Sequence, residues 1–260
     1  MSHGALLQGQ GVLVTRPEHQ AKNFIQLLKA AGADAIGFPS IEICPVAESD
    51  ALNKISSKLD QYRIIIFISA NSVENGLKFF KNSLTSLKST KIAAIGKSTK
   101  TTLEQSGLSV DLCPQQNFNS EALLELDAFS KDKINHLPIL IVKGEGGREY
   151  LQDALKNRGA QIDLADVYQR RKPDNNTQPL LELWSKNRIQ WVTVTSNEAL
   201  KNLYYMLNEQ GQSWLRQTQL VVPSQRCQQL AQQLGFSQIL LAASASDAAM
   251  FDTIKQNIHN

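Results

Sequence analysis

The sequence is poor in the residues that build metal, disulfide and membrane structures. Its 260 residues include three cysteines, Cys44, Cys113 and Cys227, which are too far apart for a CxxC metal or redox motif. Their odd number and wide spacing do not fit a disulfide framework. No apolar run approaches the roughly 20 residues of a membrane-spanning helix, and the N-terminal residues lack the basic and apolar regions of a secretory signal. We therefore expect a cytoplasmic protein that contacts no membrane.

Histidine and the common catalytic motifs are also scarce. The four histidines, His3, His19, His136 and His259, show no metal-ligand spacing, and no G-x-S-x-G nucleophile elbow occurs. No cysteine has an evident histidine partner, and the acidic residues are spread along helical stretches. These absences argue against a metalloenzyme and against the common serine and cysteine hydrolases.

The net charge is small. Lysine and arginine number 27 against 24 acidic residues, which gives a formal charge of +3. That excess is too low to indicate a nucleic-acid partner, but it fits an anionic small molecule if the positive groups gather at one site. Hydrophobic residues make up 42% and charged residues 20%, as in ordinary globular proteins. A chain of this length forms one large domain or two modest ones.

Short β-branched runs alternate with helical stretches along the chain. The expected strands are Val12–Thr15, Ile64–Ser69, Lys91–Ile95, Ile139–Lys143, Trp191–Thr195 and Gln219–Val222. A helix is expected over 21–31, where Phe24, Leu27 and Leu28 share one face. Continuous apolar strands that alternate with helices are typical of parallel sheets covered on both faces. The predicted fold class is α/β.

The two halves of the chain repeat each other at a spacing of about 127 residues. The matched pairs at 127 are Val14 and Ile141, Gly32 and Gly159, Ala33 and Ala160, and Ser69 and Ser196 (141 − 14 = 127; 196 − 69 = 127). Two further pairs fall close to it, Gly107 and Gly235 at 128, and Ser120 and Ser246 at 126. Because four kinds of segment recur in the same order in both halves of the chain, we predict an internal duplication.

The duplication does not predict a simple cut in the middle of the chain. Extended, proline-bounded segments occupy equivalent places in the repeat, at 38–45 and 166–173. If the chain crosses between domains at both, the first domain is discontinuous and consists of 1–37 plus 174–260. The second domain is then 46–165, each domain has five strands, and the two crossings pair as a hinge. A cleft between such domains is the expected ligand site.

The glycine-rich turn KGEGGR, at 143–148, raises the question of a nucleotide site. It matches neither G-x-G-x-x-G nor G-x-x-x-x-G-K-[ST], and its counterpart RPEHQA, at 16–21, contains no glycine. We therefore predict no nucleotide site. Two interpretations stay open: a strand-to-helix turn that needs positive φ, and a turn whose backbone amides bind an anion. Arg16 and Lys143 end matching strands, and Arg148 follows one turn later.

Four serine-bearing turns follow predicted strands and open predicted helices. They are SAN (69–71), GKST (96–99), TSN (195–197) and PSQRC (223–227). Serine and asparagine at such places are ordinary helix N-caps. The alternative is that their hydroxyls and amides bind carboxylates, because ligand sites of α/β proteins lie at the carboxyl ends of strands.

One candidate proton donor remains, Tyr168 in the second crossing segment. A tyrosine in such a strand is commonly a packing residue. A phenol is also protonated at neutral pH, however, and this suits general-acid catalysis. Both interpretations stay open at this point.

Taken together, these segments resemble the uroporphyrinogen-III synthase family over essentially the whole chain. The segments that carry the resemblance are VLVTRP (12–17), FISANSV (67–73), IAAIGKSTKTTLEQSG (92–107), LIVKGEGGREYLQDALKNRGA (140–160), VYQRR (167–171), VTSNEAL (194–200) and ASASDAAM (243–250). None is diagnostic alone, but their order and spacing together are fairly specific.

The resemblance implies two flavodoxin-like parallel-sheet domains joined by a two-stranded β-ladder hinge, with the tetrapyrrole in the cleft. The implied activity is a cyclising lyase that converts hydroxymethylbilane to uroporphyrinogen III, with inversion of ring D and loss of water. It implies no metal and no organic cofactor. We expect a monomer that makes transient contact with hydroxymethylbilane synthase, the enzyme that supplies this substrate.

The resemblance also implies the site residues. The family tyrosine in VYQ matches Tyr168 and is expected to assist loss of the substrate hydroxyl, and the threonine of the G-x-x-T turn matches Thr99. In the second copy Cys227 stands where a threonine is common. With the turns above, the expected substrate-binding residues are Thr15, Arg16, Pro17, Ser69, Ala70, Asn71, Ser98, Thr99, Lys143, Gly144, Gly146, Arg148, Ser196, Asn197, Ser224 and Arg226.

The competing hypothesis is a two-lobed binding or sensor protein for an anionic small molecule, with the same fold and no chemistry. The sequence shows neither an export signal nor an appended DNA-binding motif that would support it.

Overall fold

The chain folds into two compact units, each built on its own five-stranded sheet. The structure is a computed structural model that describes residues 6–84, 89–147 and 149–258. Unit 1 consists of Met1–Glu42 and Arg171–Asn260, and unit 2 of Ile43–Arg170. The chain therefore passes between units inside the two segments, 38–45 and 166–173, that the sequence analysis selected as crossings. That the units are independently folding domains stays a prediction.

Unit 1 is a doubly wound α/β structure. Its strands, in sheet order, are β10 (Ile239–Leu241), β9 (Gln219–Val222), β8 (Trp191–Thr193), β1 (Gly11–Val14) and β2 (Asp34–Gly37). All four neighbouring pairs are parallel. Numbered by their order within the unit, these strands run 2-1-3-4-5, the flavodoxin-like order, whose switch point lies between β1 and β8.

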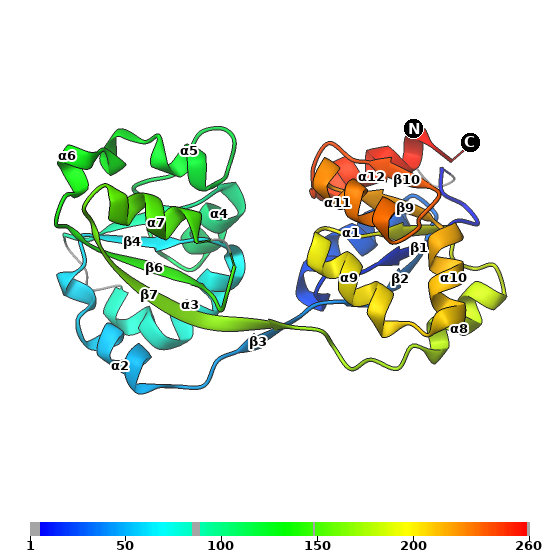
Figure 1. Ribbon diagram of the computed structural model, residues 1–260, viewed down its shortest axis with the longest axis horizontal. Helices are drawn as coiled ribbons and strands as arrows, with labels where there is room; N and C mark the ends of the chain where they lie inside the picture. Colours follow the sequence, from blue (N-terminus) through cyan, green and yellow to red (C-terminus); the bar gives the residue numbers. More distant parts are fainter. Residues whose placement is uncertain (1–5, 85–88, 148, 259–260) are drawn as a thin grey trace. The chain divides into compact units, whose positions relative to one another are not determined.

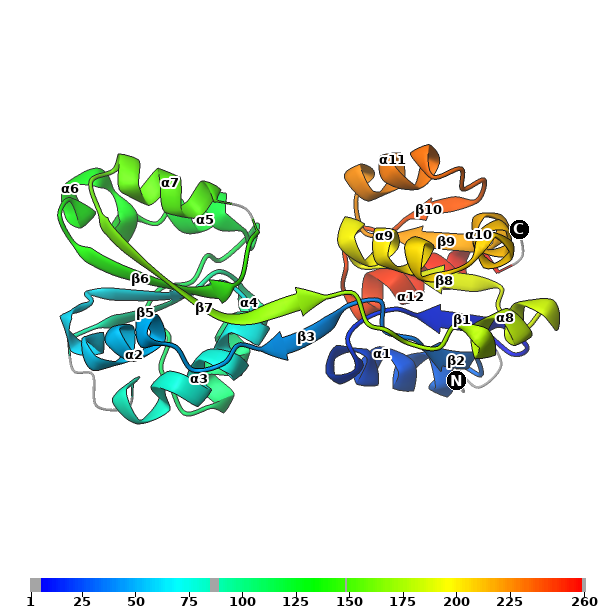
Figure 2. The same ribbon diagram turned by 60° about the horizontal axis from the view of Figure 1, so that its bottom comes forward.

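Helices cover both faces of this sheet. They are α1 (Glu18–Ala30), α8 (Gln178–Ser185), α9 (Asn197–Met206), α10 (Glu209–Gln217), α11 (Gln225–Gln233) and α12 (Asp247–Gln256). Within the unit, α1 packs beside α12 and α9 beside α11, and Figure 2 shows these two pairs on opposite sides of the strands. Parallel sheets occur almost only with both faces covered in this way.

The sheet of unit 2 has the order β3 (Glu42–Pro45), β7 (Gln161–Arg171), β6 (Pro138–Gly144), β4 (Ile64–Phe67) and β5 (Lys91–Ala94). The pairs β7–β6, β6–β4 and β4–β5 are parallel. Strand β3 lies next to β7, so the pairing expected of the two crossing segments occurs, with β7 running as one strand from 161 to 171. Two parallel-dominated α/β sheets confirm the predicted fold class.

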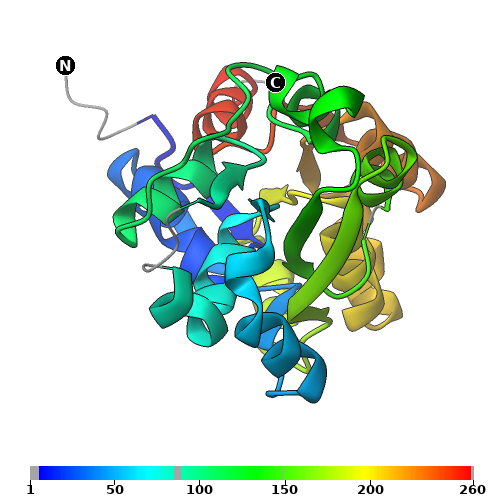
Figure 3. The same ribbon diagram turned by 90° about the vertical axis from the view of Figure 1, so that its left-hand side faces the viewer.

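The helices of unit 2 form two layers. The chain contributes α2 (Asp50–Ser57), η1 (Leu59–Gln61), α3 (Ala70–Leu84), α4 (Lys97–Gln105), α5 (Ser120–Leu124), η2 (Asp127–Phe129), α6 (Lys131–Ile134) and α7 (Tyr150–Asn157). Figures 1 and 3 show α2 and α3 on one side of the sheet and α5, α6 and α7 on the other.

The interior strand β4 shows why helices cover both faces of this sheet. Its four residues are all buried. Ile65 and Phe67 belong to the apolar core on one face, whereas Ile64 and Ile66 belong to the core on the other face. Successive side chains of a strand point to opposite faces, so an unbroken apolar run must be covered on both sides.

The sequence repeat is also a structural repeat. In unit 1 Gly11 pairs with Asp34, and in unit 2 Pro138 pairs with Gln161 (11 + 127 = 138; 34 + 127 = 161). A parallel bridge between Ala93 and Leu112 supplies the counterpart of β10, since 112 + 127 = 239. Apart from β3, which lies at the edge beyond β7, the two sheets therefore share one strand order.

Glycines end the matching helices in the same conformation. Gly32 and Gly159 follow α1 and α7 with φ of +92° and +91°, and Gly107 and Gly235 follow α4 and α11 with φ of +85° and +86°. This left-handed conformation after a helix favours glycine, which explains why these four residues stand out in the sequence repeat. Among the described residues no helix is both long and apolar enough to cross a membrane.

Candidate active site

The site in unit 2 is built at the carboxyl ends of β4, β6 and β7. These ends bring together the Ser69 turn, the glycine-rich turn and Tyr168, which lie far apart in the sequence. A pocket of about 150 Å³ lies here, and we call it the Tyr168 pocket. Its lining includes Ile95, Ser120, Lys143, Gly146, Tyr168 and Arg170. Ligand sites of α/β sheets form at this edge, beyond the carboxyl ends of parallel strands.

A register shift places Tyr168 in the site. Along most of the β6–β7 pair the residues advance together, so that Lys143 pairs with Asp166. The next residue of β6, Gly144, pairs with Tyr168, which leaves one extra residue on β7. Bulges of this kind re-aim side chains and are common next to active sites. Glu145 N–H then donates to Tyr168 O at 2.8 Å and holds the shifted register.

The Tyr168 ring packs directly against Gly144. A Cβ added to Gly144 would lie 2.5 Å from Cζ and 2.6 Å from Cε2 of Tyr168. No side chain fits at that distance unless the ring moves. Tyr168 is 3% exposed and belongs to the core of unit 2. Both sequence interpretations of Tyr168 are therefore compatible with the structure, because the residue belongs to the core and also lines the pocket.

The hydroxyl of Tyr168 lies 3.3 Å from the hydroxyl of Ser69. Ser69 Oγ also accepts a hydrogen bond from Ser72 N–H at 3.0 Å, which is the N-terminal cap of α3. Ser72 Oγ in turn donates to Ser69 O at 2.7 Å. Either hydroxyl can be the donor in this contact, because a hydroxyl has one proton and two acceptor lone pairs. In the arrangement in which Ser69 donates, the Tyr168 proton is available to a ligand.

Two glycines shape the turn that follows β6. Gly146 and Gly147 have φ of +68° and +93°, a conformation that other residues rarely adopt. Both are exposed and line the pocket. Lys143 lines it as well, but its Nζ donates to Asp166 Oδ1 at 2.9 Å. Arg148, which the sequence analysis placed in this turn, lies outside the described residues.

The remaining predicted residues of unit 2 lie around the neighbouring strand ends. Ala70 and Asn71 open α3 beside Ser69. Ser98 is exposed in the first turn of α4, whereas Thr99 is buried at 3% exposure. Gly96, which precedes this helix, packs so closely against Phe118 that a Cβ would lie 2.8 Å from the Phe118 Cβ.

The predicted residues of unit 1 also lie at carboxyl ends of strands, where most of them have structural partners. Ser196 and Ser224 cap α9 and α11 by accepting from Ala199 N–H and Cys227 N–H. Thr15 is fully buried and donates to Thr193 O at 2.8 Å. The capping interpretation of these serines is thus confirmed, and a role in substrate binding stays a prediction.

Arg16 is held by internal contacts of unit 1. Its guanidinium forms an ion pair with Asp247, donates to Ala245 O at 2.7 Å and lies 5.2 Å from the centre of the Phe24 ring. These contacts connect the end of β1 to the start of α12. Pro17 is the N-cap residue of α1, and Asn197 and Arg226 lie in the first turns of α9 and α11.

In the second copy of the G-x-x-T turn only the last residue is buried, because Ser224 and Arg226 before it are exposed. Cys227 occupies the place that matches Thr99 and has no exposed surface. Burial raises the pKa of its thiol to about 11, so the thiol stays protonated and unreactive at neutral pH. Because Thr99 is buried too, the cysteine fits the packing requirement of this position.

Three polar pocket residues are absent from the set predicted from the sequence: Ser120, Gln152 and Arg170. Arg170 follows Tyr168 by two residues on the same strand. Its position in the VYQRR segment was visible in the sequence, but only the placement of β7 beside the glycine-rich turn identifies it as a pocket residue.

The fold and this site define a class: a two-unit α/β protein with duplicated parallel sheets and a tyrosine hydroxyl at the carboxyl edge of one of them. Comparison with known proteins assigns the family. The sequence pattern of the family described as uroporphyrinogen-III synthase HemD matches residues 22–252. The chain belongs to the uroporphyrinogen-III synthase family.

Individual relatives agree with this assignment. The chain is 28% identical over 251 residues to the uroporphyrinogen-III synthase of Escherichia coli (strain K12), and the match covers 94% of this chain and 99% of that protein. It is 25% identical over 194 residues to a putative uroporphyrinogen-III synthase of Methanothermobacter thermautotrophicus, with 74% and 75% of the two chains covered.

Solved structures share the fold. A mutant uroporphyrinogen III synthase from the extremely thermophilic bacterium Thermus thermophilus superposes with a TM-score of 0.61 at 12% identity, covering 96% of this chain and 98% of that one. The enzyme from Helicobacter pylori 26695 gives a TM-score of 0.59 at 13% identity, covering 94% and 97%.

Proposed function

We propose that this protein is a uroporphyrinogen-III synthase, a lyase that cyclises hydroxymethylbilane to uroporphyrinogen III with inversion of ring D and loss of water. Family membership supports an enzyme over a non-catalytic binding protein. The observation that carries the proposal is Tyr168, which lines a pocket and whose hydroxyl lies 3.3 Å from the hydroxyl of Ser69.

The first chemical step is loss of the substrate hydroxyl. The C–O bond of the hydroxymethyl group breaks, and Tyr168 gives its proton to the departing oxygen, so that water leaves and a protonated azafulvene, the azafulvenium cation, forms beside the Tyr168 phenolate. Ser69 donates to the phenolate oxygen that results. A positioned proton donor contributes about 10²–10⁴-fold to a rate, and a hydrogen bond to a charged group, such as that from Ser69 to the phenolate, contributes about 1.5–3 kcal/mol.

The later steps require positioning rather than further side-chain chemistry. The substituted carbon of ring D attacks the azafulvene and gives a spiro intermediate, which fragments and recloses with ring D inverted. The ring carbon loses a proton at the final closure, and this balances the proton that Tyr168 gave. The substrate closes without inversion when it is left alone, so the protein must hold the two ends in register, which is proximity catalysis.

The acidic side arms of the substrate provide the groups by which it can be held. Each pyrrole carries an acetate and a propionate, and the glycine-rich turn is the type of backbone that approaches an anion closely. We propose that amides of this turn and of the Ser69 turn bind such carboxylates. Which residues of unit 1 also bind the substrate stays a prediction, as does contact with hydroxymethylbilane synthase.

The test is an isomer assay. Purified protein is incubated with freshly made hydroxymethylbilane, the products are oxidised, and the porphyrin isomers are separated by chromatography. We expect isomer III to dominate. If only isomer I forms, at the rate seen without protein, the proposal is wrong and a binding protein becomes the better hypothesis.

A further inference from the structure

The two copies of the repeat differ at two places on the strand that carries Tyr168. Tyr168 and Arg170 correspond to Ile41 and Ile43 of the first copy (41 + 127 = 168; 43 + 127 = 170). Ile41 is buried at 8% exposure, and Ile43 packs against the core of unit 2. Apolar side chains therefore satisfy the fold at both places. In the second copy packing accounts for the ring of Tyr168, which is 3% exposed, but not for the exposed side chain of Arg170.

Arg170 lies against the glycine-rich turn. A Cβ placed on Gly147 would be 3.8 Å from Nη2 of Arg170, an ordinary van der Waals distance. Arg170 lines the Tyr168 pocket together with Gly146 and Gly147. A guanidinium beside a turn of exposed backbone amides combines two kinds of anion-binding group.

Among the described residues two cations line this pocket, and they differ in their surroundings. The Lys143 side chain is 13% exposed and pairs with Asp166. Arg170 also has an interaction partner, but its side chain is exposed and lines the pocket. Arginine also presents a planar fork that matches the two oxygens of a carboxylate, whereas lysine acts as a point charge. The chemistry of the pocket therefore points to Arg170 for carboxylate binding.

The size of the pocket limits what it can hold. Sites that enclose a whole drug-sized ligand are typically about 300–1,000 Å³, whereas this pocket measures about 150 Å³. It has room for one acidic side arm of a pyrrole, not for a four-ring substrate.

From these observations we infer that Arg170 binds one carboxylate side arm of the substrate and so positions the neighbouring part of the substrate at the Tyr168 hydroxyl. Arg170 is then a substrate-binding residue that acts equally in the ground state and the transition state, and Tyr168 transfers the proton. This inference rests on the proposed function, because the ligand is the carboxylate-bearing substrate of that reaction.

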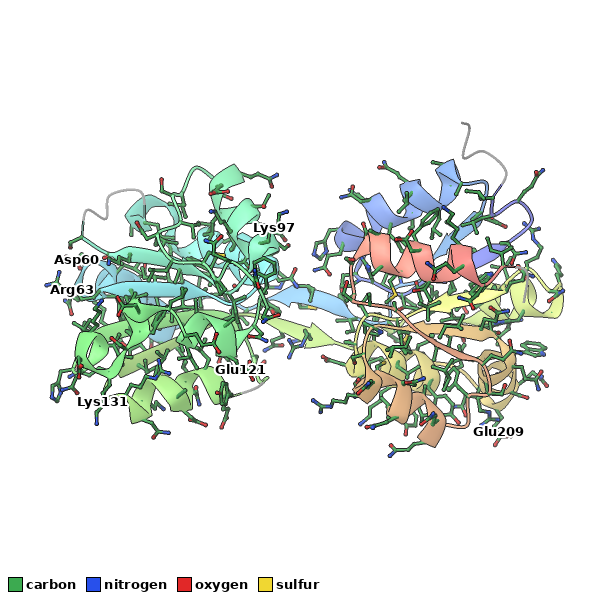
Figure 4. All side chains as sticks on the ribbon, turned by 90° about the horizontal axis from the view of Figure 1, so that it is seen from above. Asp60, Arg63, Lys97, Glu121, Lys131 and Glu209 are labelled. Carbon is green, nitrogen blue, oxygen red and sulfur yellow. The ribbon has the colours of Figure 1, made fainter. Side chains whose placement is uncertain are left out.

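The experiment compares three variants with the parent enzyme: Arg170→Gln, Arg170→Lys and the control Arg63→Gln. Arg63 is an exposed arginine of the same unit, just before β4, at the opposite edge of the sheet from the pocket. Figure 4 shows Arg63 at the far end of unit 2 from Lys97, whose helix starts beside the pocket. The measurements are kcat and KM for hydroxymethylbilane, each at two salt concentrations, and the thermal unfolding midpoint.

We expect Arg170→Gln to raise KM about 10- to 100-fold, the usual size of a hydrogen-bonded contact to a charged group, and to leave kcat within about threefold. Loss of ground-state binding has this signature. Arg170→Lys should recover part of the affinity, because it keeps the charge but not the fork. The KM of Arg170→Gln should also depend less on salt than that of the parent.

Three outcomes would overturn the inference. One is a KM of Arg170→Gln equal to that of the parent and of Arg63→Gln. Another is an equal rise in KM for Arg63→Gln, because this would show a general charge effect. A third is a fall in kcat of Arg170→Gln together with a thermal unfolding curve that shows this variant has lost its folded state. In each of these cases a parent enzyme that still makes isomer III leaves the proposed function standing. A parent that makes no isomer III would instead contradict the function itself.

Discussion

Gly144 and Tyr168 face each other across β6 and β7 so closely that a single methyl group on Gly144 would meet the tyrosine ring at 2.5 Å. The register shift between the two strands produces this contact. Gly144 does not have positive φ in the structure, so its backbone conformation would allow a residue with a side chain. Only the Tyr168 ring excludes a side chain at this position.

Gly144→Ala should therefore destabilise the protein through overpacking, by about 1–3 kcal/mol, and should lower activity because the ring must move. Urea unfolding and the isomer assay measure the two effects. The control is Gly37→Ala in unit 1, where a Cβ would meet only the flexible end of Ile25 at 3.3 Å. In a Tyr168→Ala background, Gly144→Ala should cost at least about 1 kcal/mol less, as expected for coupled neighbours. Additive costs would contradict the contact.

Tyr168→Phe tests the proton donor. The phenyl ring keeps the packing over Gly144, so stability should change little. We expect kcat to fall by about 10²–10⁴-fold while KM stays nearly constant, because the lost interaction acts in the transition state. The residual product should still be mainly isomer III. Tyr205→Phe, on a residue of α9 that is 63% exposed, is the matched control. Parent-like activity of Tyr168→Phe would show that the tyrosine only packs.

Ser69→Ala tests the partner of Tyr168. The variant loses the hydroxyl that lies 3.3 Å from the Tyr168 oxygen and the cap of Ser72 N–H. We expect kcat/KM to fall about 10- to 150-fold, the contribution of one hydrogen bond to a charged phenolate, or about 1.5–3 kcal/mol. A modest loss of stability from the helix cap should accompany it. A loss in kcat/KM beyond about 3 kcal/mol would mean that Ser69 itself transfers a proton.

A second polar cluster of unit 2 predicts a pH dependence of stability. Asp163 on β7 accepts from Lys58 Nζ at 2.7 Å and from the Tyr62 hydroxyl at 2.5 Å. The hydrogen bond from Lys58, with that from Tyr62, lowers the pKa of Asp163. Burial, with Asp163 beside it, raises the pKa of Tyr62. Folding thus favours the charged carboxylate and the neutral phenol.

The stabilisation by this cluster should be present between the ordinary pKa of an aspartate, about 4, and that of a tyrosine, about 10. It should be lost as pH falls below the first, because the carboxylate is protonated, and as pH rises above the second, because the unfolded phenol ionises. Asp163→Asn should therefore be less stable than the parent near pH 7, and the difference should shrink towards pH 3.

Urea unfolding of the parent and of Asp163→Asn at pH 3, 5, 7 and 9 measures this difference. Asp60→Asn is the control, on an exposed aspartate of the neighbouring η1 turn. A difference in unfolding free energy that is constant across this range would show that the charge of Asp163 does not contribute.

Much of the fold could be predicted because local interactions determine it. The apolar run of β4, the serine caps and the terminal glycines of the helices each depend on residues within a few positions, and each was visible in the sequence. The spacing of 127 residues between the copies followed from the same local signals. The edge strand β10 was missed, because its three residues are only partly buried or exposed and follow no continuous apolar pattern.

The site depended on tertiary structure. Ser69, Gly144 and Tyr168 come together because β4, β6 and β7 are neighbours in one sheet, and strand order is a long-range property that no local pattern specifies. The sequence by itself determined the α/β class, the duplication and the candidacy of Tyr168. Only the tertiary structure decided that the β6–β7 register shift seats its ring on Gly144, brings its hydroxyl to Ser69 and places Arg170 in the same pocket. One residue inserted into one strand of a pair changes every contact beyond it, and its effect exists only once the partner strand is in place.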